Sequence, residues 1–373
     1  MTRTRIAGLL ATAVLALAGI SPAVAPRVAV MAVPDGGLQP QAVVDASDTV
    51  HLLYFKGEPG HGDLFYARLP RGATAFTSPI RVNSEAGSAI ATGSVRGGRL
   101  AVGRDGWVHA AWNDATGTTM WYARISTRGT VEPQRSIGSH HRHLDGGGSI
   151  AADRRGNVAI TWHAAGDVDG EDHRRIYVAR STDDGGRFGV ETAYAMAGGN
   201  CGCCRLDSLI DARGALQVLY RAAAGAVHRD ATWLSIENGT AQSPVTLQQW
   251  ELPACPMTTF ALTESGGRLV AAWETAHQIY TTTLDRATRH ASAAQAMQGS
   301  GIRKHPAVAI DAAGHQLFAW TEGTAWARGG HVAWELRAAD GRPLAAAADA
   351  GPVPIWGLVA AVARADGSFL IMR

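Results

Sequence analysis

The side chains best suited to chemistry are four cysteines gathered in one stretch of the chain. Cys201, Cys203 and Cys204 lie in the run Cys-Gly-Cys-Cys-Arg, and Cys255 follows in the run Cys-Pro-Met. Thiolates are soft ligands that select Cu(I) or Zn²⁺. In an exported protein, four cysteines also suit two disulfides, for which three pairings exist. The residues leave both interpretations open, and they favour at least one disulfide between the triplet and Cys255.

A second set of polar residues follows aromatic residues at the ends of apolar runs. Asn113, His163, Arg221 and Glu274 each come directly after Trp or Tyr, and Asp114 comes one position later. Arginine can bind a carboxylate through two parallel hydrogen bonds, and acids can transfer protons. Glu274 and Asp114 are therefore candidate catalytic carboxylates, while Arg221, His163 and Asn113 are candidate ligand-binding residues.

Arg229 and Asp230 join the ligand-binding set because they lie between the two cysteine runs. Together these side chains would suit a small anionic or polyhydroxylated ligand such as a glycan. The other interpretation is a solvated rim, since strand ends usually carry polar residues.

A repeat indicates how such distant residues meet. Seven times, a turn residue is followed six positions later by the end of an apolar run, which is aromatic in the first six cases. Successive turns lie 47 to 58 residues apart. The pairs are Asp48–Tyr54, Gly106–Trp112, Gly156–Trp162, Gly214–Tyr220, Gly267–Trp273, Gly314–Trp320 and Gly367–Arg373. A repeat of about 50 residues built from short strands is typical of a β-propeller with one blade per repeat.

The predicted class is therefore all-β, with four-stranded blades, because alternation of period two dominates and no long amphipathic helix is evident. Seven hairpins favour seven blades, and six remain the alternative if one terminal hairpin packs outside the ring. The chain ends at Arg373 just after the seventh second strand. We expect residues 27–33 to complete that last blade, since closure removes an open sheet edge.

The first 25 residues have the pattern of a signal peptide. Arg3 and Arg5 precede an apolar stretch too short to span a bilayer comfortably, and Ala23-Val24-Ala25 is a small-residue cleavage site, with a second choice at Ala32. No cysteine precedes Cys201, so no lipid anchor is expected. Residues 26–373 are then a single propeller domain, periplasmic or secreted, without a membrane span.

The charge balance argues against some partners. Removing residues 1–25 takes away two arginines and no acid, so the formal net charge falls from +2 to zero. Neither nucleic acid nor an anionic membrane is expected as a partner. An acidic loop that contains Asp167, Asp169, Glu171 and Asp172 is a weak candidate for Ca²⁺.

Residues 181–188 resemble the Asp-box of the sialidase-like (BNR) propeller superfamily. The motif matches at Ser181, Asp183, Gly185 and Phe188 and departs at Arg187. In that family it stabilises a hairpin between the third and fourth strands of a blade, far from the axis. The cysteine runs and Arg229-Asp230 also resemble segments of exported proteins described as sialidases, which implies a shared site without an activity.

The resemblance implies a propeller that binds carbohydrate or hydrolyses glycosides. Sialidases use three arginines, a tyrosine nucleophile with a supporting glutamate, and an aspartate. Here Arg221 is a candidate for one of the arginines and Glu274 for the supporting acid, but no early Arg-Ile-Pro motif is present and the last tyrosine is Tyr280. Whether the protein is an enzyme stays open. The alternative is a non-catalytic propeller whose cysteines, as disulfides or with metal, form a redox or protein-docking surface.

Overall fold

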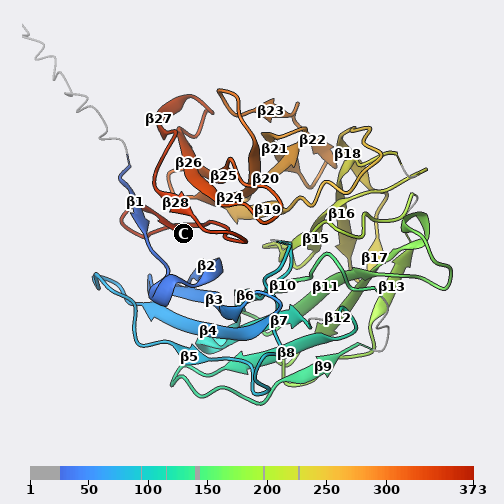
Figure 1. Ribbon diagram of the computed structural model, residues 1–373, viewed down its shortest axis with the longest axis horizontal. Helices are drawn as coiled ribbons and strands as arrows, with labels where there is room; N and C mark the ends of the chain where they lie inside the picture. Colours follow the sequence, from blue (N-terminus) through green and yellow to red (C-terminus); the bar gives the residue numbers. More distant parts are fainter. Residues whose placement is uncertain (1–25, 94, 115, 139–142, 196–197, 226) are drawn as a thin grey trace, which may run out of the picture.

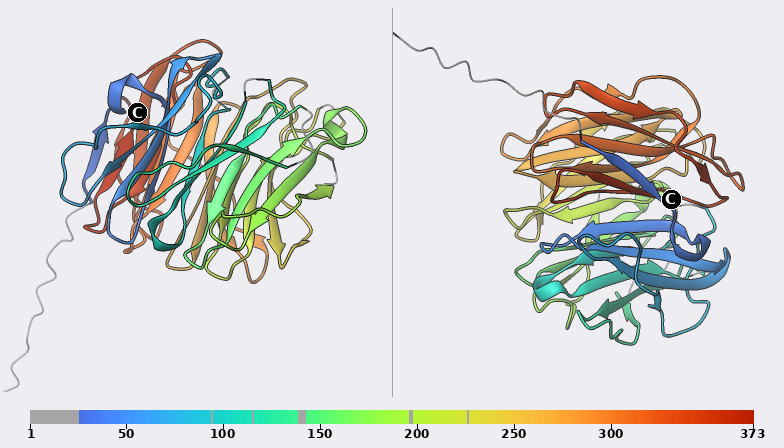
Figure 2. Two further views of the ribbon diagram at one scale, coloured as in Figure 1. Left: turned by 90° about the horizontal axis from the view of Figure 1, so that it is seen from below. Right: turned by 90° about the vertical axis from the view of Figure 1, so that its left-hand side faces the viewer.

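The computed structural model describes residues 26–93, 95–114, 116–138, 143–195, 198–225 and 227–373. Seven small sheets stand in a ring around a common axis (Figure 1), and the side views show them as upright blades next to one another (Figure 2). The structure confirms the all-β class and the seven-bladed propeller. The six-bladed alternative is wrong, because the terminal hairpin lies within the ring as its seventh blade.

The first three blades each have four strands in sequence order, counted outward from the axis. The first contains β2 (Leu38–Val44), β3 (Val50–Glu58), β4 (His61–Leu69) and β5 (Ile80–Arg81). The second contains β6 (Arg99–Val102), β7 (Val108–Asn113), β8 (Met120–Ile125) and β9 (Arg135–Ile137). The third contains β10 (Ser149–Ala152), β11 (Val158–Ala164), β12 (Arg175–Ser181) and β13 (Thr192–Ala195).

The next three blades have a divided outer edge, so that two short strands pair with each third strand. The fourth contains β14 (Asp207–Ile210), β15 (Leu216–Arg221), β16 (Ala231–Glu237), β17 (Thr240–Ala241) and β18 (Val245–Gln248). The fifth contains β19 (Phe260–Ser265), β20 (Arg268–Thr275), β21 (Gln278–Asp285), β22 (His290–Ala291) and β23 (Gln295–Ala296). The sixth contains β24 (Arg303–Ile310), β25 (Gln316–Glu322), β26 (Gly330–Arg337), β27 (Pro343–Ala347) and β28 (Pro352–Val353).

The seventh blade joins the two ends of the described chain. Strands β29 (Ala360–Ala363) and β30 (Phe369–Met372) form its hairpin, and β1 (Val28–Met31) pairs with β30 in parallel. In Figure 1 the blue strand β1 accordingly lies against the red C-terminal strands. This confirms that the segment after residue 26 completes the last blade. The described residues also form three single-turn 3₁₀ helices: η1 (Pro34–Gly36), η2 (Arg104–Gly106) and η3 (Glu171–His173).

The seven turns predicted from the repeat all have the backbone conformation that the prediction requires. Each turn residue has a positive φ, the region that glycine adopts without steric cost. The values are Asp48 64°, Gly106 77°, Gly156 97°, Gly214 90°, Gly267 78°, Gly314 86° and Gly367 78°. All seven join the first and second strands of a blade, so they gather at one end of the propeller, which we call the hairpin end.

The opposite end, here the loop end, carries the second-strand termini and the connections between blades. The aromatic residues near these termini are buried: Tyr54, Trp112, Trp162, Tyr220, Trp273 and Trp320. Each core cluster joins neighbouring blades, as where Trp112 of β7 packs with Leu53 and Phe55 of β3. Burial of such large side chains between blades is the main stabilising contribution of the ring.

The segment that resembles an Asp-box lies between β12 and β13. The Ser181 hydroxyl donates to Asp183 at 2.6 Å and accepts the Gly185 N–H at 3.0 Å, while Asp183 accepts the Arg187 N–H at 2.9 Å. The ring of Phe188 packs edge-on against Tyr122 of the second blade, with centroids 4.9 Å apart. The motif therefore stabilises a hairpin and ties two blades together.

Within the described residues, we find no helix of the length and apolarity that crossing a membrane demands. Residues 1–25, and with them the predicted signal peptide, lie outside that part of the chain.

Candidate functional site

The innermost strands of all seven blades surround an axial channel of about 430 Å³. Most of its lining is aliphatic, because first strands present small apolar side chains to the axis. Polar side chains interrupt that surface, namely Gln41, Arg99, Arg205, Asp207, Ser208, Thr263 and Glu264. The channel wall therefore combines aliphatic residues with polar groups from several blades.

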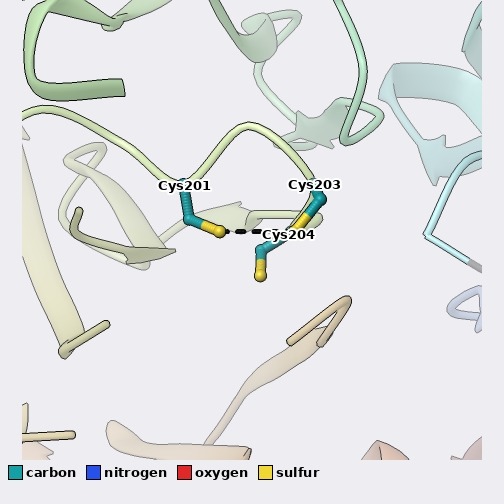
Figure 3. Close-up of side chains that lie close together, drawn as sticks. All are labelled: Cys201, Cys203 and Cys204. Carbon is teal, nitrogen blue, oxygen red and sulfur yellow. Dashed lines mark hydrogen bonds between the residues drawn. The ribbon is translucent and has the colours of Figure 1, made fainter. Parts of the chain in front are cut away.

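Next to this channel, at the loop end, three cysteines meet in the connection between β13 and β14. The sulfur atoms of Cys201, Cys203 and Cys204 all lie within 4.8 Å of one another (Figure 3). Cys201 Sγ and Cys203 Sγ are 3.5 Å apart. Cys201 and Cys204 are buried, and Cys203 is partly exposed. Among the described residues, this is the only group of three or more His, Cys, Asp or Glu side chains placed to hold a metal ion.

All four cysteines are free thiols in the structure. The expected disulfide between the triplet and Cys255 is not formed, and Cys255 is exposed and stands outside the cluster. The disulfide is predicted from the number of cysteines in an exported chain, which says nothing about their burial. The fold buries Cys201 and Cys204 and leaves Cys255 at the surface.

Cys204 is the thiol best prepared to ionise. Its sulfur accepts the Thr258 N–H at 3.5 Å and the Thr258 hydroxyl at 3.3 Å. Burial alone would raise its pKa, but hydrogen bonds from the Cys201 and Cys203 thiols, the charge of Arg221 and the bond from Thr258 together hold the pKa of Cys204 well below its ordinary value. Hydrogen bonds to Cys201 and Cys204, followed by burial, raise the pKa of Cys203. Of the three thiols, Cys204 therefore ionises most readily.

Basic residues from two blades hold the cysteine loop. Arg229 Nη2 donates to Glu171 Oε2 at 2.7 Å, and the other oxygen of Glu171 accepts the Gly202 N–H at 2.7 Å. Arg174 bonds the His143 carbonyl and approaches His163 Nδ1 at 3.1 Å. These contacts fix the loop backbone, and they place the charge of Arg174 near Cys201 and Cys203.

The structure brings Arg221 and His163 to the cysteine loop but does not leave them open to a ligand. Arg221 is buried and donates to the Arg229 and Glu274 carbonyls, at 2.7 and 2.5 Å, and to Thr258 Oγ1. His163 Nε2 lies 2.7 Å from the Cys204 carbonyl oxygen. Burial, followed by the charge of Arg174, lowers the pKa of His163 to about 3, so the ring is neutral at pH 7.

Glu274 lies in the same buried network. Its carboxylate accepts the His277 N–H at 3.2 Å and lies 3.7 Å from Lys304 Nζ. Burial raises its pKa, and the charges of Lys304 and Arg221 only partly oppose that rise. The remaining oxygen, Oε2, has no hydrogen-bond partner.

Asn113 and Asp114 belong to other contacts. Asn113 is buried and its amide donates to the Leu144 carbonyl at 3.0 Å. Asp114 accepts the Thr118 and Thr119 N–H groups in its own turn. Burial would raise the pKa of Asp114, but these bonds and that of the Thr116 hydroxyl hold it below its ordinary value. Neither residue touches the cysteine cluster, and Asp230 accepts the Trp250 N–H at 2.9 Å.

The acidic loop is also occupied with internal contacts. Asp167 pairs with Arg175 at 2.8 Å, Asp172 accepts the Gly225 N–H at 3.0 Å, and Glu171 supports the cysteine loop. These carboxylates point to separate partners rather than to one cation.

Two residues that sequence analysis left without a role stand out. Thr258 is the donor to Cys204, and its only sequence signal is its position just after the Cys-Pro-Met run. Arg205 follows the cysteine triplet directly and lies in the channel wall.

A pair of tryptophans marks the surface of the loop end. Trp326, in the β25–β26 connection, is 63% exposed, and its ring meets that of Trp356 edge-on at 4.8 Å. A Cβ built on Gly93 would lie 3.3 Å from Met257 Cε and 3.8 Å from Trp326. Connections from well-separated blades therefore converge here.

Comparisons with known proteins agree on the fold. No protein-family model matches the sequence, and no curated protein matches it. A Dyadobacter fermentans protein of unknown function has a similar structure, with a TM-score of 0.54 and 11% identity over 80% of this chain and 94% of the other. A functionally unknown protein from Desulfotomaculum acetoxidans has a TM-score of 0.53 and 9% identity, over 92% and 91%.

A third similar structure is a mutant of the Aleuria aurantia lectin in complex with Fucα1-6GlcNAc. Its TM-score is 0.52, with 8% identity over 85% of this chain and 96% of the lectin. At these identities the likeness extends to the propeller fold alone. The sialidase-like superfamily is not identified by these comparisons, so that resemblance rests on the Asp-box and the repeat.

Proposed function

We propose that this protein is a non-catalytic propeller that binds one Cu(I) ion through Cys201, Cys203 and Cys204. The observation that carries the proposal is the convergence of three free sulfur atoms within 4.8 Å in one buried loop. The proposal takes up the second of the two functions that the sequence left open.

The spacing of the sulfur atoms suits a metal. A metal–thiolate bond of about 2.3 Å puts the sulfurs of a trigonal site roughly 4 Å apart. The 3.5 Å between Cys201 Sγ and Cys203 Sγ is close to that value. It is far from the length of about 2.05 Å that a disulfide requires. Small side-chain movements would therefore complete a metal site.

The number of ligands favours Cu(I) over Zn²⁺. Structural zinc sites are almost always four-coordinate, whereas soft thiolates select Cu(I). No fourth His, Cys, Asp or Glu side chain joins the cluster in the described part of the chain. Three thiolates with Cu(I) would carry a net charge of −2, and the nearby charges of Arg174 and Arg221 would stabilise it.

The geometry gives less support to glycoside hydrolysis. Canonical glycosidases need two carboxyl groups on either side of one glycosidic bond. Glu274 is buried beside Lys304, and Asp114 is bonded within its own turn. Neither residue of this pair lines the axial channel.

The experiment is a Cu(I) competition titration of the reduced protein against a chromophoric Cu(I) chelator, without oxygen. We expect one Cu(I) per chain, with ultraviolet sulfur-to-copper charge-transfer bands. Cys204→Ser should weaken binding by at least 100-fold. Cys255→Ser is the matched control, because this cysteine is exposed and outside the cluster, and it should bind like the wild type. Equal binding by both variants, or stoichiometric zinc with no Cu(I), would contradict the proposal.

Carbohydrate binding is a second candidate function, favoured by the exposed Trp326 and its contact with Trp356. An exposed indole offers an apolar face with a polar edge, which suits the C–H face of a sugar ring. On a glycan array, the wild type should bind a defined set of glycans and Trp326→Ala should lose them. Identical arrays for the two proteins, or none bound, would remove this candidate.

A further inference from the structure

The axial channel contains a buried arginine whose charge has no partner. Arg205 lies in the channel wall and is 4% exposed. No hydrogen bond or ion pair forms from its guanidinium group within the described residues, and its Nε is buried without a partner. Its backbone N–H, in contrast, donates to the Thr258 carbonyl at 3.0 Å, so the residue is firmly held.

The one acid beside it is already satisfied by others. Asp207 bonds to Arg99 in an ion pair. It also accepts the Ser149 hydroxyl at 3.1 Å and the Leu262 N–H at 2.9 Å. Arg99 in turn donates to Gln41. The group formed by Arg99 and Asp207 is therefore neutral as a pair, and the charge of Arg205 remains uncompensated.

The other acid of the channel wall is also paired. Glu264 forms an ion pair with Arg286 and accepts the Ala212 N–H at 3.0 Å. A buried charge without a counter-charge is strongly unfavourable, because neither water nor an opposite charge replaces its lost hydration. The channel, at about 430 Å³, has room for a small anion with several waters.

We propose that the guanidinium group of Arg205 binds a small carboxylate or other oxyanion in the axial channel. Arginine presents a planar array of N–H donors that matches two oxygens of such an anion. The anion would supply the missing counter-charge. This site differs from the proposed copper site, although Arg205 directly follows Cys204 and Thr258 contacts both residues.

The sequence predicts Arg221 as the arginine that binds an anionic ligand. In this proposal Arg205 takes that role. Arg221 uses its donors on carbonyl and hydroxyl oxygens of the protein, whereas Arg205 leaves its donors free.

The test is equilibrium dialysis of the full chain with radiolabelled inorganic phosphate, followed by competition with acetate. We expect one phosphate per wild-type chain, displaced by acetate. Arg205→Gln should lose at least 90% of this binding, and Arg71→Gln, which changes an exposed arginine, should keep all of it. Absence of phosphate and acetate binding to the wild type, or unchanged binding by Arg205→Gln, would overturn the proposal.

A second measurement covers a variant that fails to fold. The melting temperature of the wild type should rise with the logarithm of phosphate concentration at constant ionic strength, as ligand linkage requires. Arg205→Lys keeps the charge but loses the planar array, and its response should be weaker at every concentration. An equal response of the two proteins would show a general salt effect and would contradict the site. Neither measurement depends on copper, so a negative result for anion binding would leave the proposed Cu(I) function untouched.

Discussion

The two ends of the propeller are built by different kinds of contact. At the hairpin end, Asp153 accepts N–H groups of residues two and four positions later, Arg155 and Asn157. At the loop end, the contacts of Cys204 with His163 and Thr258 span 41 and 54 positions. Local bonds can be repeated in every blade, whereas a cluster assembled from several blades occurs once. The repeated local contacts therefore account for the ring of blades, and the contacts that occur only once account for the cysteine site.

The largest expected effect comes from removing a contact between blades at the loop end. Arg221→Met would leave the Arg229 and Glu274 carbonyls without their buried donor. We expect a loss of roughly 3 kcal/mol or more in the free energy of unfolding, measured by urea denaturation. Arg154→Met, an exposed arginine at the hairpin end, is the control and should change it by less than about 0.5 kcal/mol. Equal effects would erase the contrast between the two ends.

The pH dependence of stability tests the buried loop-end contacts through Glu274. Its pKa is raised in the folded protein, mainly by burial, so folding favours its protonated form. Its contribution to stability is therefore present below the unfolded pKa and is lost as pH rises through the folded one. We expect Glu274→Gln to flatten the decline in stability on that alkaline side, measured by denaturation from pH 4 to 9. A decline of the same slope in the variant would exclude this role for Glu274.

The smallest effect is expected for a single turn at the hairpin end. Asp153→Ala removes bonds to Arg155 and Asn157 and should cost about 1 kcal/mol. Burial alone would raise the pKa of Asp153, but its hydrogen bonds hold it below the ordinary value. The contribution is thus present above the unfolded pKa and is lost as pH falls through the lower folded pKa. The variant should therefore approach wild-type stability in acid, while it binds Cu(I) unchanged at pH 7. A loss of Cu(I) binding would show that the two ends are coupled.

How much of the structure could be predicted from the sequence depends on whether a feature is set by local or by distant contacts. The turn at Gly156 and the burial of Trp162 could be predicted because a positive φ and an apolar alternation each leave a local mark in the sequence. The closing strand β1 could be expected because a propeller with an open edge would expose unpaired backbone groups. In contrast, the polar residues after the aromatic positions were expected at an accessible mouth, and the structure buries His163, Arg221 and Glu274.

The sequence by itself indicated the strands, the turns and the placement of three cysteines in one short loop, because these depend on neighbours along the chain, while the choice of seven blades over six came from the structure. Only the tertiary structure decided that Cys255 stands apart, that Thr258 donates to Cys204, and that Arg205 rather than Arg221 has a guanidinium group without a protein partner. Those outcomes depend on how neighbouring blades pack, and side chains from different blades compete for the same donors and acceptors only once the ring has closed.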